Sequence, residues 1–131
     1  RAATNALVRV SGTASRLVLE GGRETLLASV REESRQTGRR VGWARVTDSD
    51  PCYFCAMLAS RGPVYSETSG GFRAHDHCAC TVEPVVRAGG EWPGRAREFQ
   101  TLWRDSTRGT RGPESIREFR RAYESRTVDV A

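Results

Sequence analysis

All the cysteines and histidines of this 131-residue chain lie between residues 52 and 80. They form a C-x-x-C pair, followed by a second group with the spacing H-x-x-C-x-C. Thiolates and imidazoles are ligands that Zn²⁺ prefers, and these short spacings bring donor atoms to one point. The sequence therefore predicts a metal site in the middle of the chain. Its five candidate ligands are Cys52, Cys55, His75, Cys78 and Cys80.

A structural zinc site has four ligands, so the candidates allow more than one ligand set. A C-x-x-C turn aims both sulfur atoms at one point, which makes Cys52 and Cys55 the firmest pair. Cys78 and Cys80 would share one face of a strand, where both can bind the metal or one can support it. With or without His75, the result is a closed Cys₄ or Cys₃His site, and closed sites are structural.

Two polar residues inside the second group have other expected roles. Asp76 is expected to accept a hydrogen bond from the N–H of a ligand imidazole, and His77 to be a solvent-facing turn residue. The pair also resembles the Asp-His of HNH endonucleases of the endonuclease VII type, in which the histidine activates water. That family continues with a second C-x-x-C, which is missing here. A nuclease is therefore the alternative, and we expect no catalytic residue.

Two other chemistries fit these residues less well. The even number of cysteines permits two disulfides, but cysteines as close as those in C-x-x-C and C-x-C rarely pair with each other, so the bonds would have to cross between the groups. Zinc nucleobase deaminases share the P-C-x-x-C run that begins at Pro51. They also need an upstream H-x-E, and no histidine precedes His75.

The composition describes a polar chain with no apolar run near the roughly 20 residues that cross a bilayer. All 21 basic residues are arginine and 16 residues are acidic, for a net charge of +5. Arginine favours bidentate contacts with phosphate. The charge is thus compatible with nearby nucleic acid, and a zinc-ribbon nucleic-acid-binding module is a further alternative. Codon bias in a GC-rich genome explains the arginines equally well.

Helical patterns precede the metal window. The spacing of apolar residues predicts helices over 2–20 and 23–36. Gly21-Gly22 is expected to separate them, Ser11-Gly12 to interrupt the first, and Thr37-Gly38 to end the second.

The segment that contains the cysteines and histidines is expected to form a small β core. Alternating residues predict a strand over 41–47, and the turn-forming run that follows delivers the C-x-x-C to the start of a short helix. Short strands are predicted at Val64-Tyr65 and over 81–86. Two further helices are predicted over 95–107 and 114–126. Their narrow apolar stripes, expected to pack on a neighbour within the chain or on another subunit, are Phe99, Leu102 and Trp103, and Ile116, Phe119 and Tyr123.

The predicted fold class is α+β, with a small zinc-knuckle and short β-hairpin core flanked by N-terminal and C-terminal α-helices. Three segments follow: an N-terminal helical segment over 1–40, the zinc-knuckle core over 41–88 and an Arg-rich helical tail over 89–131. The chain begins at Arg1 and its single methionine is Met57. We therefore expect the first segment to be a fragment of a longer protein.

A resemblance to a known family rests on two runs, GWARVTDSDPCYFCAMLASRGPVYSE and FRAHDHCACTVEPV. They resemble the Cys/His segment of tailed-phage minor head proteins of the phage Mu F type, in the form found in phages of actinobacteria. The resemblance covers roughly residues 16–126. Its shared positions are Trp43, Arg45, Val46, Asp48, the five candidate ligands, Val64-Tyr65, Glu83-Pro84, Gly21-Gly22-Arg23-Glu24 and Phe119-Arg120-Arg121.

The resemblance implies a structural, non-enzymatic component of the virion. Such a minor capsid protein would lie near the portal and assist head morphogenesis or DNA packaging and delivery. Its partners would be portal or capsid proteins, with contact to packaged DNA, self-association and no membrane. It would be made in the host cytoplasm and located in the phage head, with Zn²⁺ as a structural cofactor.

Overall fold

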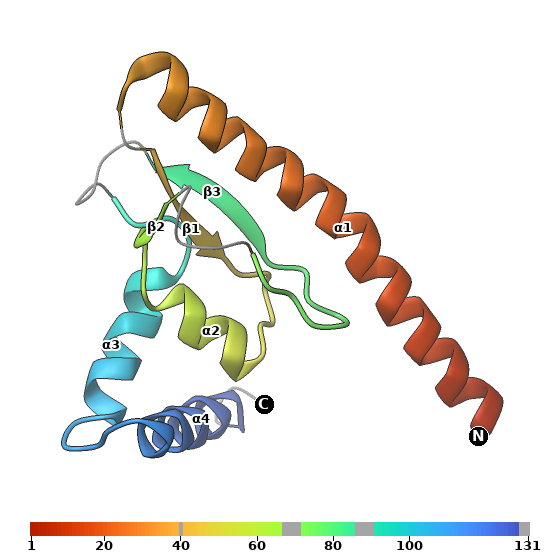
Figure 1. Cartoon of the computed structure of the whole chain (residues 1–131). Coiled ribbons are helices and arrows are strands. Elements are labelled where there is room, and N and C mark those ends of the chain that lie inside the picture. The colour runs from red at the N-terminus through yellow and green to blue at the C-terminus, as the bar shows by residue number, and fades with distance from the viewer. Residues whose placement is uncertain (40, 67–71, 86–90, 129–131) are drawn as a thin grey trace.

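The computed structural model describes residues 1–39, 41–66, 72–85 and 91–128. Within these ranges a long helix lies along a small sheet, and three shorter helices lie on the other side of the sheet (Figure 1). The α+β class predicted from the sequence is confirmed. In chain order the elements are α1 (Ala2–Thr37), β1 (Gly42–Val46), α2 (Tyr53–Ala59), β2 (Tyr65–Ser66), β3 (Thr81–Val85), α3 (Ala96–Ser106) and α4 (Pro113–Val128).

Helix α1 is continuous over 36 residues. The predicted break at Gly21-Gly22 and the predicted interruption at Ser11-Gly12 are therefore wrong. A glycine inside a helix costs only about 1 kcal/mol relative to alanine, whereas a break would give up several backbone hydrogen bonds at once. The predicted end is confirmed, because Gly38 adopts the left-handed conformation (φ 64°) that caps a helix.

The sheet has three antiparallel strands in the order β2-β1-β3. Trp43 in the central strand pairs with Tyr65 on one side and Pro84 on the other, and its ring stacks on Tyr65 at 4.3 Å between centroids. Pro84 is tolerated because β3 is an edge strand, where an N–H can be missing. The predicted strands thus exist, although the one expected at Val64-Tyr65 is observed one residue later and residue 86 lies outside the described part.

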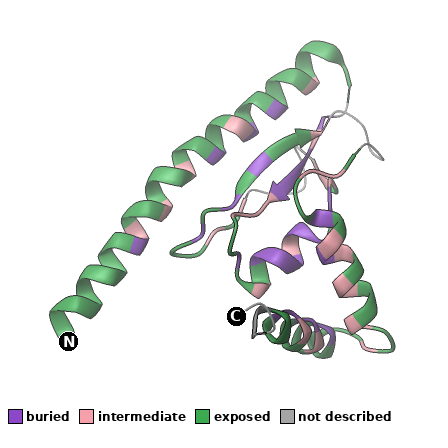
Figure 2. Ribbon diagram, turned by 180° about the vertical axis from the view of Figure 1, so that it is seen from behind, coloured by how far each residue is buried: buried purple, intermediate pink, exposed green. Residues whose placement is uncertain are grey.

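Two apolar clusters hold these elements together. The first lies between α2, α3 and α4 and the second between α1 and the sheet, as the buried segments in Figure 2 show. The predicted stripes of α3 and α4 pack within the chain, with Ile116 as the exception because it is 39% exposed. The buried residues are Ala56, Met57, Ala59, Phe99, Phe119 and Tyr123 in the first cluster, and Leu27, Val30, Val41, Trp43 and Val82 in the second.

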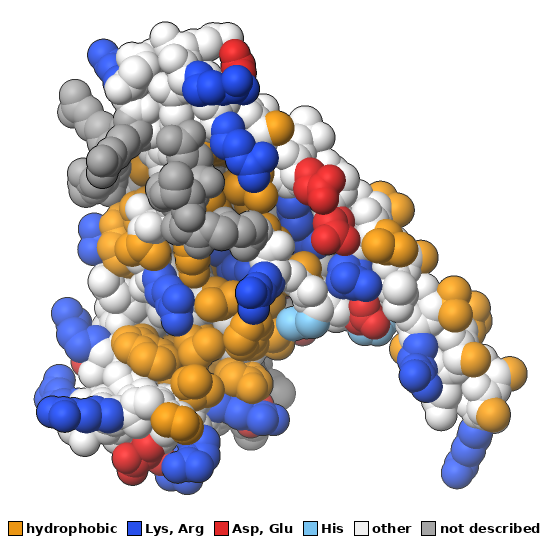
Figure 3. Space-filling model, in the orientation of Figure 1, with side chains coloured by type: hydrophobic (Ala, Val, Ile, Leu, Met, Phe, Trp, Pro, Cys, Tyr) orange, Lys and Arg blue, Asp and Glu red, His pale blue; other side chains and the backbone are white. Residues whose placement is uncertain are grey.

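The N-terminal half of α1 projects beyond the sheet (Figure 1). Several large apolar side chains are exposed there, and Figure 3 shows them along the projecting part of the helix. They are Leu7, Val8, Val10, Leu17, Val18 and Leu19. Among the described residues no helix is both long and apolar enough to cross a membrane.

Candidate metal centre

The first ligand pair lies at the start of α2. The carboxylate of Asp48 accepts a hydrogen bond from the backbone N–H of Asp50 (3.1 Å), which shapes the turn after β1. Cys52 follows as the extended N-cap residue of α2, and Cys55 lies inside the helix. Cys52 is exposed at the surface, whereas Cys55 is buried. The C-x-x-C therefore spans the boundary between solvent and core.

The second group lies on the loop that leads into β3. A turn at residues 76 and 77 reverses the chain, and the N–H of Cys78 donates to the carbonyl of His75 (3.2 Å). His77 holds the left-handed conformation (φ 64°) that this reversal requires, and it is the sole non-glycine residue in the described ranges with a positive φ. The turn brings His75 and Cys78 to the same side of the loop.

The structure brings the five predicted ligands together in two overlapping groups. One is Cys52, Cys55 and His75, the other is Cys55, Cys78 and Cys80, and the ligand atoms within each group all lie within 4.8 Å of one another. Cys55 belongs to both groups. All four cysteines are free, so there is no disulfide at this site.

The distances around Cys55 match tetrahedral coordination. Its Sγ lies 3.6 Å from the Sγ of Cys78 and 3.6 Å from the Nε2 of His75. With Zn–S near 2.3 Å and Zn–N near 2.0–2.1 Å, two sulfurs would be about 3.8 Å apart, and a sulfur and a nitrogen about 3.6 Å. The Sγ of Cys52 is closer to Nε2 of His75, at 3.0 Å. The cluster can therefore hold a metal ion, and its sulfur-rich donor set suits a soft or borderline cation.

The imidazole of His75 is oriented by its neighbour. Its Nδ1–H donates to the backbone carbonyl of Asp76 (2.7 Å), so in the neutral ring Nε2 carries the lone pair and faces the cysteines. The sequence predicted an acceptor on Asp76, and the structure corrects which atom accepts. The carboxylate of Asp76 instead accepts from Thr13 Oγ1 (3.1 Å) and from Arg16 Nε (2.9 Å) on α1.

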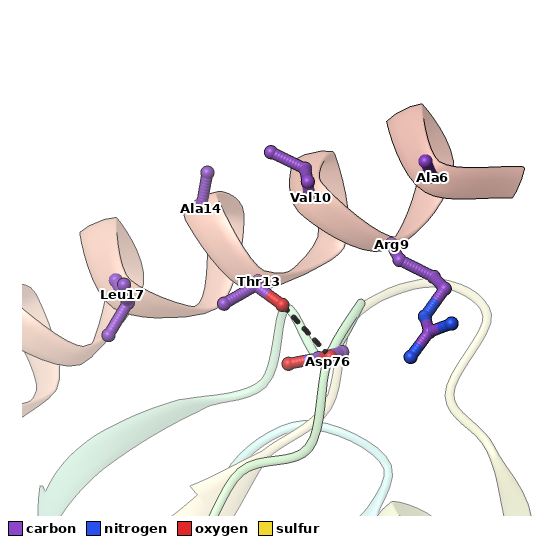
Figure 4. Close-up of a pocket in the computed structure, with 7 residues that line it drawn as sticks. All are labelled: Ala6, Arg9, Val10, Thr13, Ala14, Leu17 and Asp76. Carbon is purple, nitrogen blue, oxygen red and sulfur yellow. Dashed lines mark hydrogen bonds between the residues drawn. The ribbon is translucent and has the colours of Figure 1, made fainter. Parts of the chain in front are cut away.

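Asp76 forms the floor of a pocket against α1, and Figure 4 shows it from the side of the helix. Thr13 and Arg9 point toward the turn, whereas Val10 and Ala14 point away from it. His77, the other residue of the nuclease alternative, is exposed and belongs to neither ligand group. Its ring packs on Gly12, where a β-carbon would lie 2.4 Å from Nε2. The turn thus serves as a contact with α1.

Two buried arginines border the sulfur atoms. Arg23 of α1 is 4% exposed and Arg45 of β1 is 3% exposed. A guanidinium nitrogen of Arg23 lies 3.8 Å from the Sγ of Cys78, and one of Arg45 lies 3.9 Å from the Sγ of Cys55. Neither arginine was predicted to lie at the site. A signal was present for Arg45, which lies inside an otherwise apolar strand.

The charges around the thiols shift their pKa values in opposite directions. Hydrogen bonds from Cys55 and Cys80, together with the guanidinium of Arg23, hold the pKa of Cys78 far below its usual range. The hydrogen bonds with Cys78 and Cys80 raise the pKa of Cys55. Burial raises the pKa of Cys52, but its contacts with the Cys55 backbone and with His75 outweigh burial and lower it.

An α+β fold built around a Cys/His cluster defines a small domain with a site that can hold a metal ion. The chain belongs to the VG15 protein family, a family of phage proteins, whose model matches residues 2–105. The matched range includes α1, the sheet and all five predicted ligands. No curated protein and no solved structure matches the chain. The prediction of a phage protein is thus confirmed at the level of the family.

Proposed function

We propose that this chain is a non-enzymatic structural component of a phage virion, a minor head protein near the portal that aids head assembly or DNA packaging and delivery. Its membership of a phage family supports this class. The resemblance to minor head proteins of the phage Mu F type supports the finer assignment. In this proposal the Cys/His cluster binds Zn²⁺ as a structural ion that holds the loop before β3 against α2.

The observation that carries the assembly role is the outer face of α1. Ala3, Leu7, Val10, Ala14 and Leu17 follow one another in steps of four and three residues, which is the spacing of a helix–helix seam. Leu7 is 70% exposed, Val10 67% and Leu17 57%. We call these five residues the α1 seam. Burying an exposed apolar seam of this kind against another helix is more favourable than leaving it in contact with water.

The charges on α1 indicate which kind of partner fits the seam. Between residues 2 and 19 the charged residues are Arg9 and Arg16. Arg16 is bound to Asp76, and Arg9 points to the same side of the helix (Figure 4). The seam itself carries no charge, so its partner should be an uncharged, apolar helix face. We assign this role to a helix of the portal or capsid protein.

The test compares incorporation of seam and control variants into phage heads. Leu7→Glu with Leu17→Glu places two charges on the seam, whereas Thr4→Glu with Ser15→Glu adds the same charges to the same turns beside it. We expect the seam variant to be missing from purified heads and the control variant to be present, as measured by quantitative mass spectrometry. Parental incorporation of the seam variant would contradict docking through α1. Dimers of the isolated parent in light scattering, lost in the seam variant, would assign the seam to self-association instead.

A nicking assay on supercoiled DNA with a divalent metal distinguishes the nuclease alternative from the non-enzymatic proposal. We expect no nicking by the parent chain. If the parent nicks DNA, and His77→Ala abolishes this while zinc stays bound, the non-enzymatic proposal is wrong. Salt-dependent DNA binding with a slope of several charges would favour the nucleic-acid-binding alternative.

A further inference from the structure

The two buried arginines approach the Cys/His cluster from two different elements. Arg23 is on α1 and donates from Nε to the carbonyl of Cys80 (2.8 Å) and from Nη2 to the carbonyl of Cys78 (2.7 Å). These two bonds hold the backbone of both cysteines in the C-x-C. The same Nη2 is the atom that faces the Sγ of Cys78 at 3.8 Å.

Arg45 approaches from β1 in a similar way. Its Nη2 donates to the carbonyl of Arg73 (2.6 Å), and its Nη1 faces the Sγ of Cys55 at 3.9 Å. The ring of Phe72 packs against both guanidinium groups, at 4.7 Å from Arg23 and 3.8 Å from Arg45. Each arginine thus combines a backbone carbonyl, an aromatic face and a sulfur atom.

Neither guanidinium has a carboxylate partner among the residues that the structure describes. None of the observed ion pairs in that part of the chain includes Arg23 or Arg45. Arg23 Nη1 and Arg45 Nε are also buried and have no hydrogen-bond partner in the described part of the chain. An arginine stays charged in a protein, and a buried charge without a counter-charge is strongly unfavourable. Among the described residues, the nearest groups that can supply negative charge are the cysteine sulfurs, at 3.8 and 3.9 Å.

We propose that Arg23 and Arg45 are positioning residues that supply the counter-charge of a thiolate-bound Zn²⁺ in this cluster. The inference rests on the proposed zinc site. Zn²⁺ with three thiolates and one imidazole carries a net charge of −1, and with four thiolates −2. Two guanidinium groups, both buried beside the sulfur atoms, offset either charge. The arginines are therefore a built-in part of the metal centre, although neither is a ligand.

The test measures zinc affinity of the reduced full chain by competition with a chromogenic chelator. Arg45→Met removes the charge and keeps most of the side-chain volume, whereas Arg45→Lys keeps the charge. We expect Arg45→Met to weaken zinc binding by about 10–100-fold, the usual effect of losing a group that supports a ligand, and Arg45→Lys to restore most of it. Arg35→Met is the control, because Arg35 lies on the same helix as Arg23, is 74% exposed and pairs with Glu32 of that helix. It should bind zinc like the parent.

A second measurement separates counter-charge from packing. A packing role would lower the melting temperature of Arg45→Met equally with and without zinc and leave the zinc affinity unchanged, and that result would overturn the inference. If Arg45→Met does not fold, Arg45→Gln takes its place, and equal zinc affinities of Arg45→Gln and Arg45→Lys would overturn it as well. Absorption of the Co²⁺-substituted chain reports sulfur coordination directly, and we expect its charge-transfer bands to weaken in the neutral variants. No zinc binding by the parent would contradict the proposed site itself, whereas equal binding by parent and neutral variants contradicts only the role of the arginines.

Discussion

Gly12 shows how a single missing side chain shapes this molecule. It lies on the face of α1 that meets the turn before Cys78, and the ring of His77 occupies the space that a β-carbon would take. Gly21 lies in the same helix, but apart from its own stretch of helix no atom of the described residues lies within 4 Å of its β-carbon position. The two glycines look alike in the sequence and differ only in what stands opposite them.

This difference predicts opposite effects of the same substitution. Gly21→Ala should raise the free energy of unfolding by about 1 kcal/mol, because alanine favours a helix and meets nothing. Gly12→Ala should lower it by up to about 1 kcal/mol, because the added methyl group forces the exposed ring of His77 off α1. Chemical denaturation followed by circular dichroism measures both. Adding His77→Ala to Gly12→Ala should recover most of the loss, and a failure to do so would show that the contact does not limit α1.

At the scale of elements, α1 contacts the rest of the domain in two ways. It binds the loop that leads into β3, which carries His75, Cys78 and Cys80, and it makes apolar contacts. Arg23 binds two carbonyl groups of the C-x-C, and Arg16 and Thr13 bind Asp76. A further contact is the apolar cluster around Val30 and Trp43, nearer the C-terminal end of the helix. The position of the first half of α1 therefore depends on the shape of the loop, and the loop depends on its ligands.

Removal of the metal should loosen α1 from the loop. Trypsin cleaves after arginine, and Arg23 is protected because it is 4% exposed and bound to the loop. We expect a strong chelator to speed cleavage after Arg23, because metal binding energy is folding energy at such sites. Cleavage after Arg35, which is 74% exposed, is the internal control and should change little. Mass spectrometry of the first fragments measures both rates, and protection of Arg23 without metal would show that the loop holds its shape alone.

At the scale of the whole molecule, α2 is part of both the Cys/His cluster and the apolar core of the C-terminal helices. One end carries Cys52 and Cys55, and the rest of the helix packs against α3 and α4 through Met57 and its neighbours. The hydroxyl of Tyr123 in α4 also donates to the carbonyl of Pro51, directly before the first ligand. The C-terminal helices and the Cys/His cluster therefore both depend on the position of α2.

Because α2 contacts both parts, we expect a core substitution in α4 to change the metal affinity of the Cys/His cluster. Phe119 is fully buried between the helices, and Phe119→Ala should cost about 3–5 kcal/mol of stability. It should also weaken metal binding, because α2 loses the surface that holds its ligands in place. Denaturation and chelator competition measure the two effects. Ile116→Ala, at a position 39% exposed on the same helix, should change both only slightly. Unchanged metal affinity in Phe119→Ala would mean that the cluster folds independently of the tail.

The cysteine and histidine spacing was sufficient to predict that these five side chains converge, and local patterns predicted most elements, because both depend on neighbours along the chain. The continuity of α1 could not be predicted, since a glycine in a helix is decided by a balance of about 1 kcal/mol and by what packs against it. The acceptor of the His75 N–H could not be predicted either. A carboxylate and a backbone carbonyl of the same Asp76 compete for it, and α1 occupies the carboxylate.

The sequence by itself thus determined the kind of site, a sulfur-rich cluster that can hold a metal ion on an α+β frame, because C-x-x-C and H-x-x-C-x-C converge through local turns. Only the tertiary structure decided that Arg23 and Arg45, apart in the chain and on different elements, each face a sulfur atom of the same cluster. It also decided which apolar stripes are satisfied within the chain and that the α1 seam is left exposed. The physical reason is that burial and charge compensation depend on which segments meet in space, and local spacing carries no information about that.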